Sequence, residues 1–249
     1  MLAGSLMAVL AWGAVPMWGP WLVVPAGGLT VLALFVFYFF RDPQRPVPAG
    51  DGLVLSPGDG KIIDIREVEE PSFFAGRCRR ITIFLSVFDV HVQRAPLSGH
   101  VAHRDYRSGQ YLVAWHPKAS GANEQASLGL RTQWGPVLVR QIAGLIARRI
   151  VTYPEPGDHV QVGERIGLIR FGSRVDLFIP VDWPLSCAVG DRAVGGTTVF
   201  AHVGGRPEKA APHQTNAEAA RRRAPGPSPV AGNAQPIGAQ WVGAQEAST

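Results

Sequence analysis

Residues 171–180 read FGSRVDLFIP, an alternating stretch that is typical of a buried β-strand. One face of this strand carries a single hydroxyl in an otherwise apolar row, made up of Phe171, Ser173, Val175, Leu177 and Ile179. Gly172, directly before Ser173, can adopt backbone angles that are closed to other residues, so the peptide bond between the two can be bent. The alternative interpretation is a β-bulge with a serine that bonds its own backbone.

A second alternating stretch, residues 81–92, places polar groups on an apolar face. Asp89 and His91 follow on the face of four apolar side chains, which are Ile81, Ile83, Leu85 and Val87. A buried charge is costly unless it is paired, and the spacing of two residues lets the acid and the imidazole support each other. A purely structural Asp–His pair at a strand end explains the same pattern.

The other residues between 41 and 204 form short β-type runs separated by Gly, Pro and Asp. Residues 53–55 lead into the turn Ser56–Gly60, a strand follows over 61–68, and residues 156–167 have the pattern of a tight meander. Helical periodicity is confined to residues 136–150. We therefore predict a mainly β domain of the α+β class, with a sandwich-like or barrel-like form.

The first forty residues contain no Asp, Glu, Lys or Arg. Two apolar segments, Leu2–Trp18 and Trp21–Phe40, are each near the minimum length for a membrane span, and Pro and Gly separate them. We predict a helical hairpin that anchors the protein; the alternative is a single anchor that begins near Trp21. The basic residues Arg41 and Arg45 follow directly and place the next domain on the cytoplasmic face of the cell membrane.

Three regions are therefore expected: a hydrophobic anchor over 1–40, a globular domain over 41–204 and a disordered basic tail over 205–249. The net charge of +5 is spread thinly, so a nucleic-acid partner is not predicted, and an anionic membrane surface suits the charge better. With two separated cysteines and no ligand cluster, no metal site is predicted either.

Six segments in chain order resemble the phosphatidylserine decarboxylase family in its short bacterial and archaeal form. The resemblance runs from Phe39 to about Phe200, and its segments are 39–43, Ser56–Lys61, Phe88–Pro96, Asn123-Glu124, Ile142–Ile150 and Phe171–Asp176. Three positions depart from the family pattern. Gln125 stands where the family often has Arg, Gly58 where it often has Ala, and Arg94 where longer relatives carry a second His.

The resemblance implies that the proenzyme cuts itself between Gly172 and Ser173, into a β chain of residues 1–172 and an α chain of residues 173–249. Ser173 then becomes a pyruvoyl group, the covalent cofactor, which forms a Schiff base with the substrate amine. Asp59 and His91 complete a triad with Ser173, and Asp89 is a further candidate to orient His91. The implied substrate is phosphatidylserine in an anionic membrane, and the products are phosphatidylethanolamine and carbon dioxide. The oligomeric state stays open, a homo-oligomer included.

In this hypothesis His91 takes the proton of Ser173 Oγ, which attacks the carbonyl carbon of Gly172. All of this chemistry lies between residues 59 and 173, so removal of residues 1–40 is expected to leave self-cleavage intact. Pyridoxal phosphate is not expected, because none of the three lysines, Lys61, Lys118 and Lys209, lies in a recognisable cofactor motif.

Three rival classes fit the sequence less well than a decarboxylase. A lipoyl or biotinyl carrier shares the turn-rich β-hairpins but needs a lysine at a hairpin tip, which this sequence lacks. A membrane-fusion adaptor keeps that fold without the lysine but needs long helical heptads. A membrane-anchored serine hydrolase would not be expected to cut itself.

Overall fold

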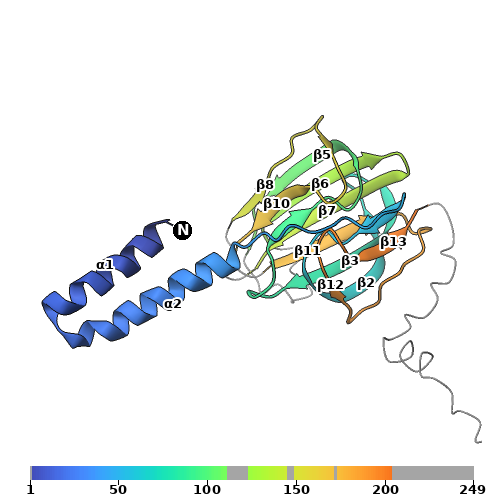
Figure 1. The fold of residues 1–249 in the computed structure, drawn as a ribbon. Helices are drawn as coiled ribbons and strands as arrows, with labels where there is room; N and C mark the ends of the chain where they lie inside the picture. Colours follow the sequence, from blue (N-terminus) through green and yellow to red (C-terminus); the bar gives the residue numbers. More distant parts are fainter. Residues whose placement is uncertain (1, 111–122, 145–148, 171–172, 204–249) are drawn as a thin grey trace, which may run out of the picture. The chain divides into compact units, whose positions relative to one another are not determined.

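The computed structural model describes residues 2–110, 123–144, 149–170 and 173–203. Gly172 of the predicted cleavage site and the predicted tail, residues 205–249, lie outside this part of the chain. The described residues comprise two apolar helices followed by a domain of β-strands (Figure 1).

The helices α1 (Leu2–Trp18) and α2 (Val23–Phe39) run side by side and are joined by a short 3-10 turn, Pro20–Leu22. The chain reverses at Gly19, whose φ of 107° lies in the left-handed region that favours glycine. Among the described helices, the continuous segment Pro20–Phe39 has the length and composition of a membrane span, with 20 residues and a mean hydropathy of 2.2. The helical part of α1 is shorter than such a span.

Within the described residues, the strands form one curled eight-stranded antiparallel sheet in the order β12-β2-β3-β11-β7-β6-β5-β9, a three-stranded sheet β4-β10-β8 and the pair β1-β13 (Figure 1). The strand bounds are β1 Leu53–Leu55, β2 Gly60–Glu70, β3 Gly76–Leu85, β4 Val92–Arg94, β5 Gly99–Arg107, β6 Gln125–Thr132, β7 Gly135–Ala143, β8 Ile150–Thr152, β9 His159–Val160, β10 Arg165–Ile169, β11 Ser173–Ile179, β12 Arg192–Ala193 and β13 Val199–His202. The predicted fold class, mainly β with an apolar helical segment in front, is confirmed.

Strand β11 lies in the middle of the large sheet, between β3 and β7. All seven of its residues are buried, and its alternate side chains from Ser173 to Ile179 face the main core, as the sequence predicts. On the opposite face Arg174 and Asp176 form a buried ion pair at 2.8 Å. The strand that carries Ser173 is therefore held on both edges and both faces.

Two predicted elements are wrong. Residues 81–92 are not one strand, because β3 ends at Leu85 and the chain turns at Ser86–Asp89, where the carboxylate of Asp89 accepts the backbone N–H of Ser86 at 2.8 Å. Residues 136–143 are a strand, not a helix, because β7 fills the position between β6 and β11 in the sheet. Residues 145–148 of that predicted helix lie outside the described residues, and its last residue, Ile150, begins β8.

Candidate active site

Ser173 is the first residue of β11, and its backbone pairs with Leu85 on one side and Ala143 on the other. Its side chain is fully buried, and its hydroxyl has no hydrogen-bond partner within the described part of the chain. A buried hydroxyl without a partner costs about 1–3 kcal/mol of stability, so such a group calls for a functional explanation. The residue expected to be the nucleophile thus has an unused hydroxyl, which among the described residues it shares with Thr197.

His91 lies just after the turn that ends β3, and it too is fully buried. Its Nδ1 bonds the carbonyl oxygen of Asp89 at 2.9 Å. Because a carbonyl oxygen accepts and cannot donate, Nδ1 carries the proton and Nε2 holds the lone pair. Burial lowers the pKa of His91 from 6.5 to about 4, although the hydrogen bond to the carbonyl of Asp89 acts to raise it. The ring is therefore neutral at physiological pH, as a general base must be.

Buried amides hold the backbone of His91 in place. The side chain of Gln93 donates to the carbonyl of His91 at 2.8 Å, and Gln141 of strand β7 donates to Gln93 at 2.8 Å. The backbone N–H of Ile169 donates to the same carbonyl of His91 at 3.2 Å. These bonds tie the segment around His91 to β10 and to the large sheet.

Asp59 lies in the turn Ser56–Gly60, directly before β2. Its two carboxylate oxygens accept from Arg45 at 2.5 and 2.7 Å, and one of them also accepts the N–H of Gly195 at 2.8 Å. Gly60 closes the turn with a φ of 153°, and a Cβ there would lie 2.1 Å from the carbonyl oxygen of Phe84. A glycine is needed at this position so that β2 can begin against β3.

The structure places the three predicted triad residues at one end of β3 and β11. A Cβ on Gly58, in the turn that carries Asp59, would lie 3.8 Å from the side chains of Leu85 and Val175. Leu85 is the register partner of Ser173. Ile169, four residues before Ser173 in the chain, donates its backbone N–H to the carbonyl of His91. The charge of Asp59 is one of the contributions that partly offset the lowering of the His91 pKa by burial.

Asp89, the other residue expected to orient His91, does so through its main chain. Its carbonyl holds the imidazole, while its buried carboxylate accepts from Ser86 and forms an ion pair with Arg192. The side chain of Asp89 thus shapes the turn that presents His91. The sequence pattern named both residues and left the contact between them open; in the structure that contact is made by the carbonyl of Asp89.

Four residues near the site were not named as catalytic candidates from the sequence. Arg45 and Arg192 bind the two carboxylates, Asn123 donates to the carbonyl of Ala143 at 2.8 Å beside Ser173, and Phe39 packs on His91 with ring centroids 4.3 Å apart. Phe39 and Asn123 fall in segments that carry the family resemblance, which was the available signal. Nothing local in the sequence indicates their partners.

The site fits a prosthetic group that forms from Ser173 itself. The buried hydroxyl of Ser173, which has no partner among the described residues, is the group that such a reaction would consume. Lys118 and Lys209 lie outside the described residues, and Lys61 is exposed on β2. No group of three or more His, Cys, Asp or Glu side chains in the described segments has the arrangement of a metal site.

A buried serine at the start of a central strand and a neutral histidine at the same end of the sheet are the groups that a serine-dependent, histidine-assisted enzyme requires. The sequence model of the phosphatidylserine decarboxylase family matches residues 32–201, and the chain belongs to this family.

Curated relatives agree with this assignment over most of their length. The chain is similar to the phosphatidylserine decarboxylase proenzyme of Symbiobacterium thermophilum, with 53% identity over 69% of this chain and 80% of the relative. It is similar to the proenzyme of Salinibacter ruber, with 46% identity over 82% and 88%, and to that of Trichlorobacter lovleyi, with 43% identity over 81% and 92%.

Proposed function

We propose that this chain is a self-processing decarboxylase that converts phosphatidylserine to phosphatidylethanolamine and carbon dioxide in phospholipid biosynthesis. Membership of the family supports the reaction and the substrate, and the relatives' description as proenzymes supports self-processing. The observation in the structure that carries the proposal is the buried hydroxyl of Ser173, which has no partner among the described residues.

Self-cleavage begins when Nε2 of His91 takes the proton of Ser173 Oγ and the oxygen attacks the carbonyl carbon of Gly172. The peptide bond becomes an ester, and loss of the serine α-proton then breaks that ester. This leaves Gly172 with a free carboxylate and residue 173 as dehydroalanine. Water replaces the nitrogen of the dehydroalanine, ammonia leaves, and a pyruvoyl ketone remains at the start of the α chain.

The pyruvoyl ketone supplies the electron sink that decarboxylation of an amino acid needs. In the mature enzyme, His91 is the group that we assign to return a proton to the substrate α-carbon. The β chain of residues 1–172 supplies His91 and Asp59, whereas the α chain of residues 173–249 supplies the pyruvoyl group. Neither chain alone therefore has the whole site.

The apolar helices suit an enzyme whose substrate stays in the bilayer. Each methylene group moved from lipid into water costs about 0.8 kcal/mol, so the site must meet the headgroup at the membrane surface. Arg41 and Arg45 directly after α2 favour the cytoplasmic face, and the basic tail over 205–249 favours anionic lipid.

The mass of the purified wild-type protein tests the proposal. A cut between residues 172 and 173 divides the 249 residues into chains of 172 and 77 residues. By proportion their masses are about 18 and 8 kDa, and loss of ammonia makes the smaller chain about 17 Da lighter than one that begins with serine. Intact-mass spectrometry measures both. A fully active preparation that holds uncut protein alone would contradict the proposal.

Removal of the anchor tests where the enzyme works. A chain without residues 2–37 keeps Phe39 and the linker after it, so we expect it to cut itself and to turn over short-chain soluble phosphatidylserine. We expect its turnover on phosphatidylserine vesicles to fall at least tenfold, because it no longer stays at the surface. Decarboxylation assays on both substrates give the ratio. A chain without residues 205–249 is the control, and equal rates on vesicles for all three proteins would show that the β domain binds membrane unaided.

A further inference from the structure

Phe39, the last residue of α2, differs from the other large apolar residues of that helix. It is fully buried, whereas Phe37 and Leu34 are 49% and 63% exposed. Exposed apolar residues are what a helix presents to lipid. The burial of Phe39 means that the end of the helix packs against the β domain.

The ring of Phe39 packs on the imidazole of His91. Their centroids are 4.3 Å apart and their planes are tilted by 34°. The carbonyl of Asp89 fixes the imidazole in its plane through Nδ1, and Phe39 covers one face of it. Both contacts constrain the orientation of this ring, and the second comes from the anchoring helix.

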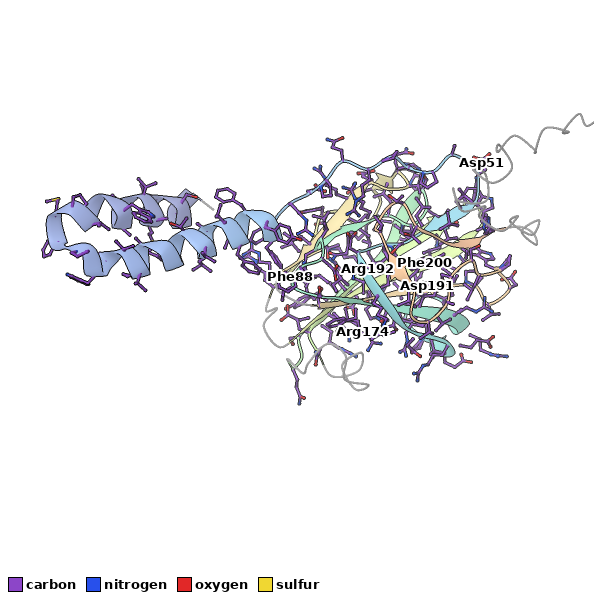
Figure 2. The ribbon with its side chains drawn as sticks, turned by 60° about the horizontal axis from the view of Figure 1, so that its bottom comes forward. Asp51, Phe88, Arg174, Asp191, Arg192 and Phe200 are labelled. Atoms are coloured by element: carbon purple, nitrogen blue, oxygen red, sulfur yellow. The ribbon has the colours of Figure 1, made fainter. Side chains whose placement is uncertain are left out.

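The end of α2 is also bound to the turn that presents His91. Arg41 donates to the carbonyl of Phe88 at 2.6 Å, and the hydroxyl of Tyr38 donates to the same oxygen at 3.4 Å. The guanidinium of Arg41 lies 3.8 Å from the centre of the Tyr38 ring. Phe88 lies where α2 meets the β domain (Figure 2). Phe39 is thus held against the imidazole by bonds on either side of it in the sequence.

The linker after α2 is bound to the same region. Asp42 pairs with Arg94 at 2.6 Å, three residues beyond His91, and also with Arg165. Arg45 pairs with Asp59. The segment from the end of the helix to Arg45 is therefore joined to the β domain near both His91 and Asp59.

We infer that Phe39 is a positioning residue of the catalytic centre, so that the end of the membrane helix forms one wall of the active site. Its ring holds the imidazole of His91 in its working orientation and keeps water from it. The inference rests on the proposed role of His91. It means that self-cleavage depends on the last residue of the anchoring helix, and not only on the residues of the β domain.

The pH dependence of self-cleavage follows from this contact. Burial lowers the pKa of His91 to about 4; Asp89 and Asp59 raise it, and Arg41 lowers it. Arg192 and Arg45 pair with those two carboxylates. A base works in its neutral form, which exists above its pKa. Removal of the Phe39 ring admits water and moves the pKa of His91 up toward 6.5, so activity is lost on the acidic side.

The test compares Phe39→Ala with Phe37→Ala, a change of the same residue type on the exposed side of the same helix. Full-length proteins are made in a short cell-free pulse with lipid nanodiscs and diluted into buffers from pH 5 to 8.5. The rate at which the two chains appear is then followed on gels. With a pKa near 6.5, about one histidine in eleven is neutral at pH 5.5, so we expect Phe39→Ala to cut about tenfold more slowly there than at pH 8. Wild type and Phe37→Ala should differ little between these two values.

Conservative variants separate positioning from folding. Phe39→Tyr restores the ring and should bring the acidic limb of the profile back to that of wild type. Phe39→Leu fills the space without an aromatic ring, so the protein should stay well packed. We expect it to cut more slowly than wild type, which tests the inference even if the Phe39→Ala protein is not stable enough to be recovered. The inference would be overturned if Phe39→Ala cut at the wild-type rate with the wild-type pH profile. If the Phe39→Ala protein cannot be recovered, the same result for Phe39→Leu would overturn it. If His91→Ala also cut normally, the proposed function itself would fall.

Discussion

Ser173→Ala is expected to leave one uncut chain of 26.7 kDa with no decarboxylase activity. The same side chain supplies the nucleophile for the cut and the atoms of the cofactor, so one substitution removes both. The loss should not come from unfolding. The hydroxyl of Ser173 has no partner in the described structure, and removal of an unsatisfied buried group does not cost stability. Intact-mass spectrometry and thermal unfolding of the same sample measure the two effects separately.

Ser127→Ala is the matched control for this prediction. Ser127 is also buried in the large sheet, on β6, but its hydroxyl accepts from Arg140 at 3.0 Å. Its loss should lower the stability of the protein by about 1 kcal/mol and leave the cut unchanged. Self-cleavage of Ser173→Ala, or no self-cleavage of Ser127→Ala, would contradict the proposed role of Ser173 as the nucleophile.

The sequence predicts the strand around Ser173 well because alternation is a local property. Each of its side chains already shows in the sequence which face it occupies. The same reasoning failed at residues 81–92, where apolar alternation continues two residues past Leu85 into a turn. The bond from Ser86 to the Asp89 carboxylate ends the strand there, and an Asp at that position in a sequence does not reveal its partner.

The strand β7 was mistaken for a helix for a related reason. A run of apolar residues such as 136–150 fits a buried strand as well as a buried helix. Pairing with β6 and β11 decides between them; β6 directly precedes β7 and forms a hairpin with it, but β11 lies much later in the chain. Long-range pairing is information that no local pattern contains.

The candidate site shows the same division. Ser173, His91 and Asp59 could be named from short motifs, but the groups that hold them come from elsewhere in the chain. Arg45 reaches Asp59 across 14 residues, and Arg192 reaches Asp89 across 103. From the sequence, the anchor appeared separate from the chemistry. The contact between Phe39 and His91 argues against that separation.

His91→Ala is expected to slow self-cleavage by roughly 10²–10⁴-fold, because the hydroxyl of Ser173 loses its base. Wild type should cut at a nearly constant rate from pH 5.5 to 8, since its pKa of about 4 keeps His91 neutral over that range. Pulse-chase gels give both rates. The control is His103→Ala, since His103 also lies beside a phenylalanine ring, that of Phe73 at 5.7 Å, but on strand β5. Equal rates for His91→Ala and wild type would return Asp89 and His91 to a structural role.

The variant Asp59→Asn is also expected to slow self-cleavage. Asp59 pairs with Arg45, so a change at Arg45 shows whether the carboxylate acts on the imidazole or holds the linker. If Asp59 acts directly on the imidazole, Arg45→Gln should cut nearly as fast as wild type. If Asp59 acts by holding the linker, Arg45→Gln should be as slow as Asp59→Asn, and the double variant should be no slower than either. Because both oxygens of Asp59 accept from Arg45, we expect the second result. The acid of the triad then works by fixing the end of the anchor, the same segment that places Phe39 on His91.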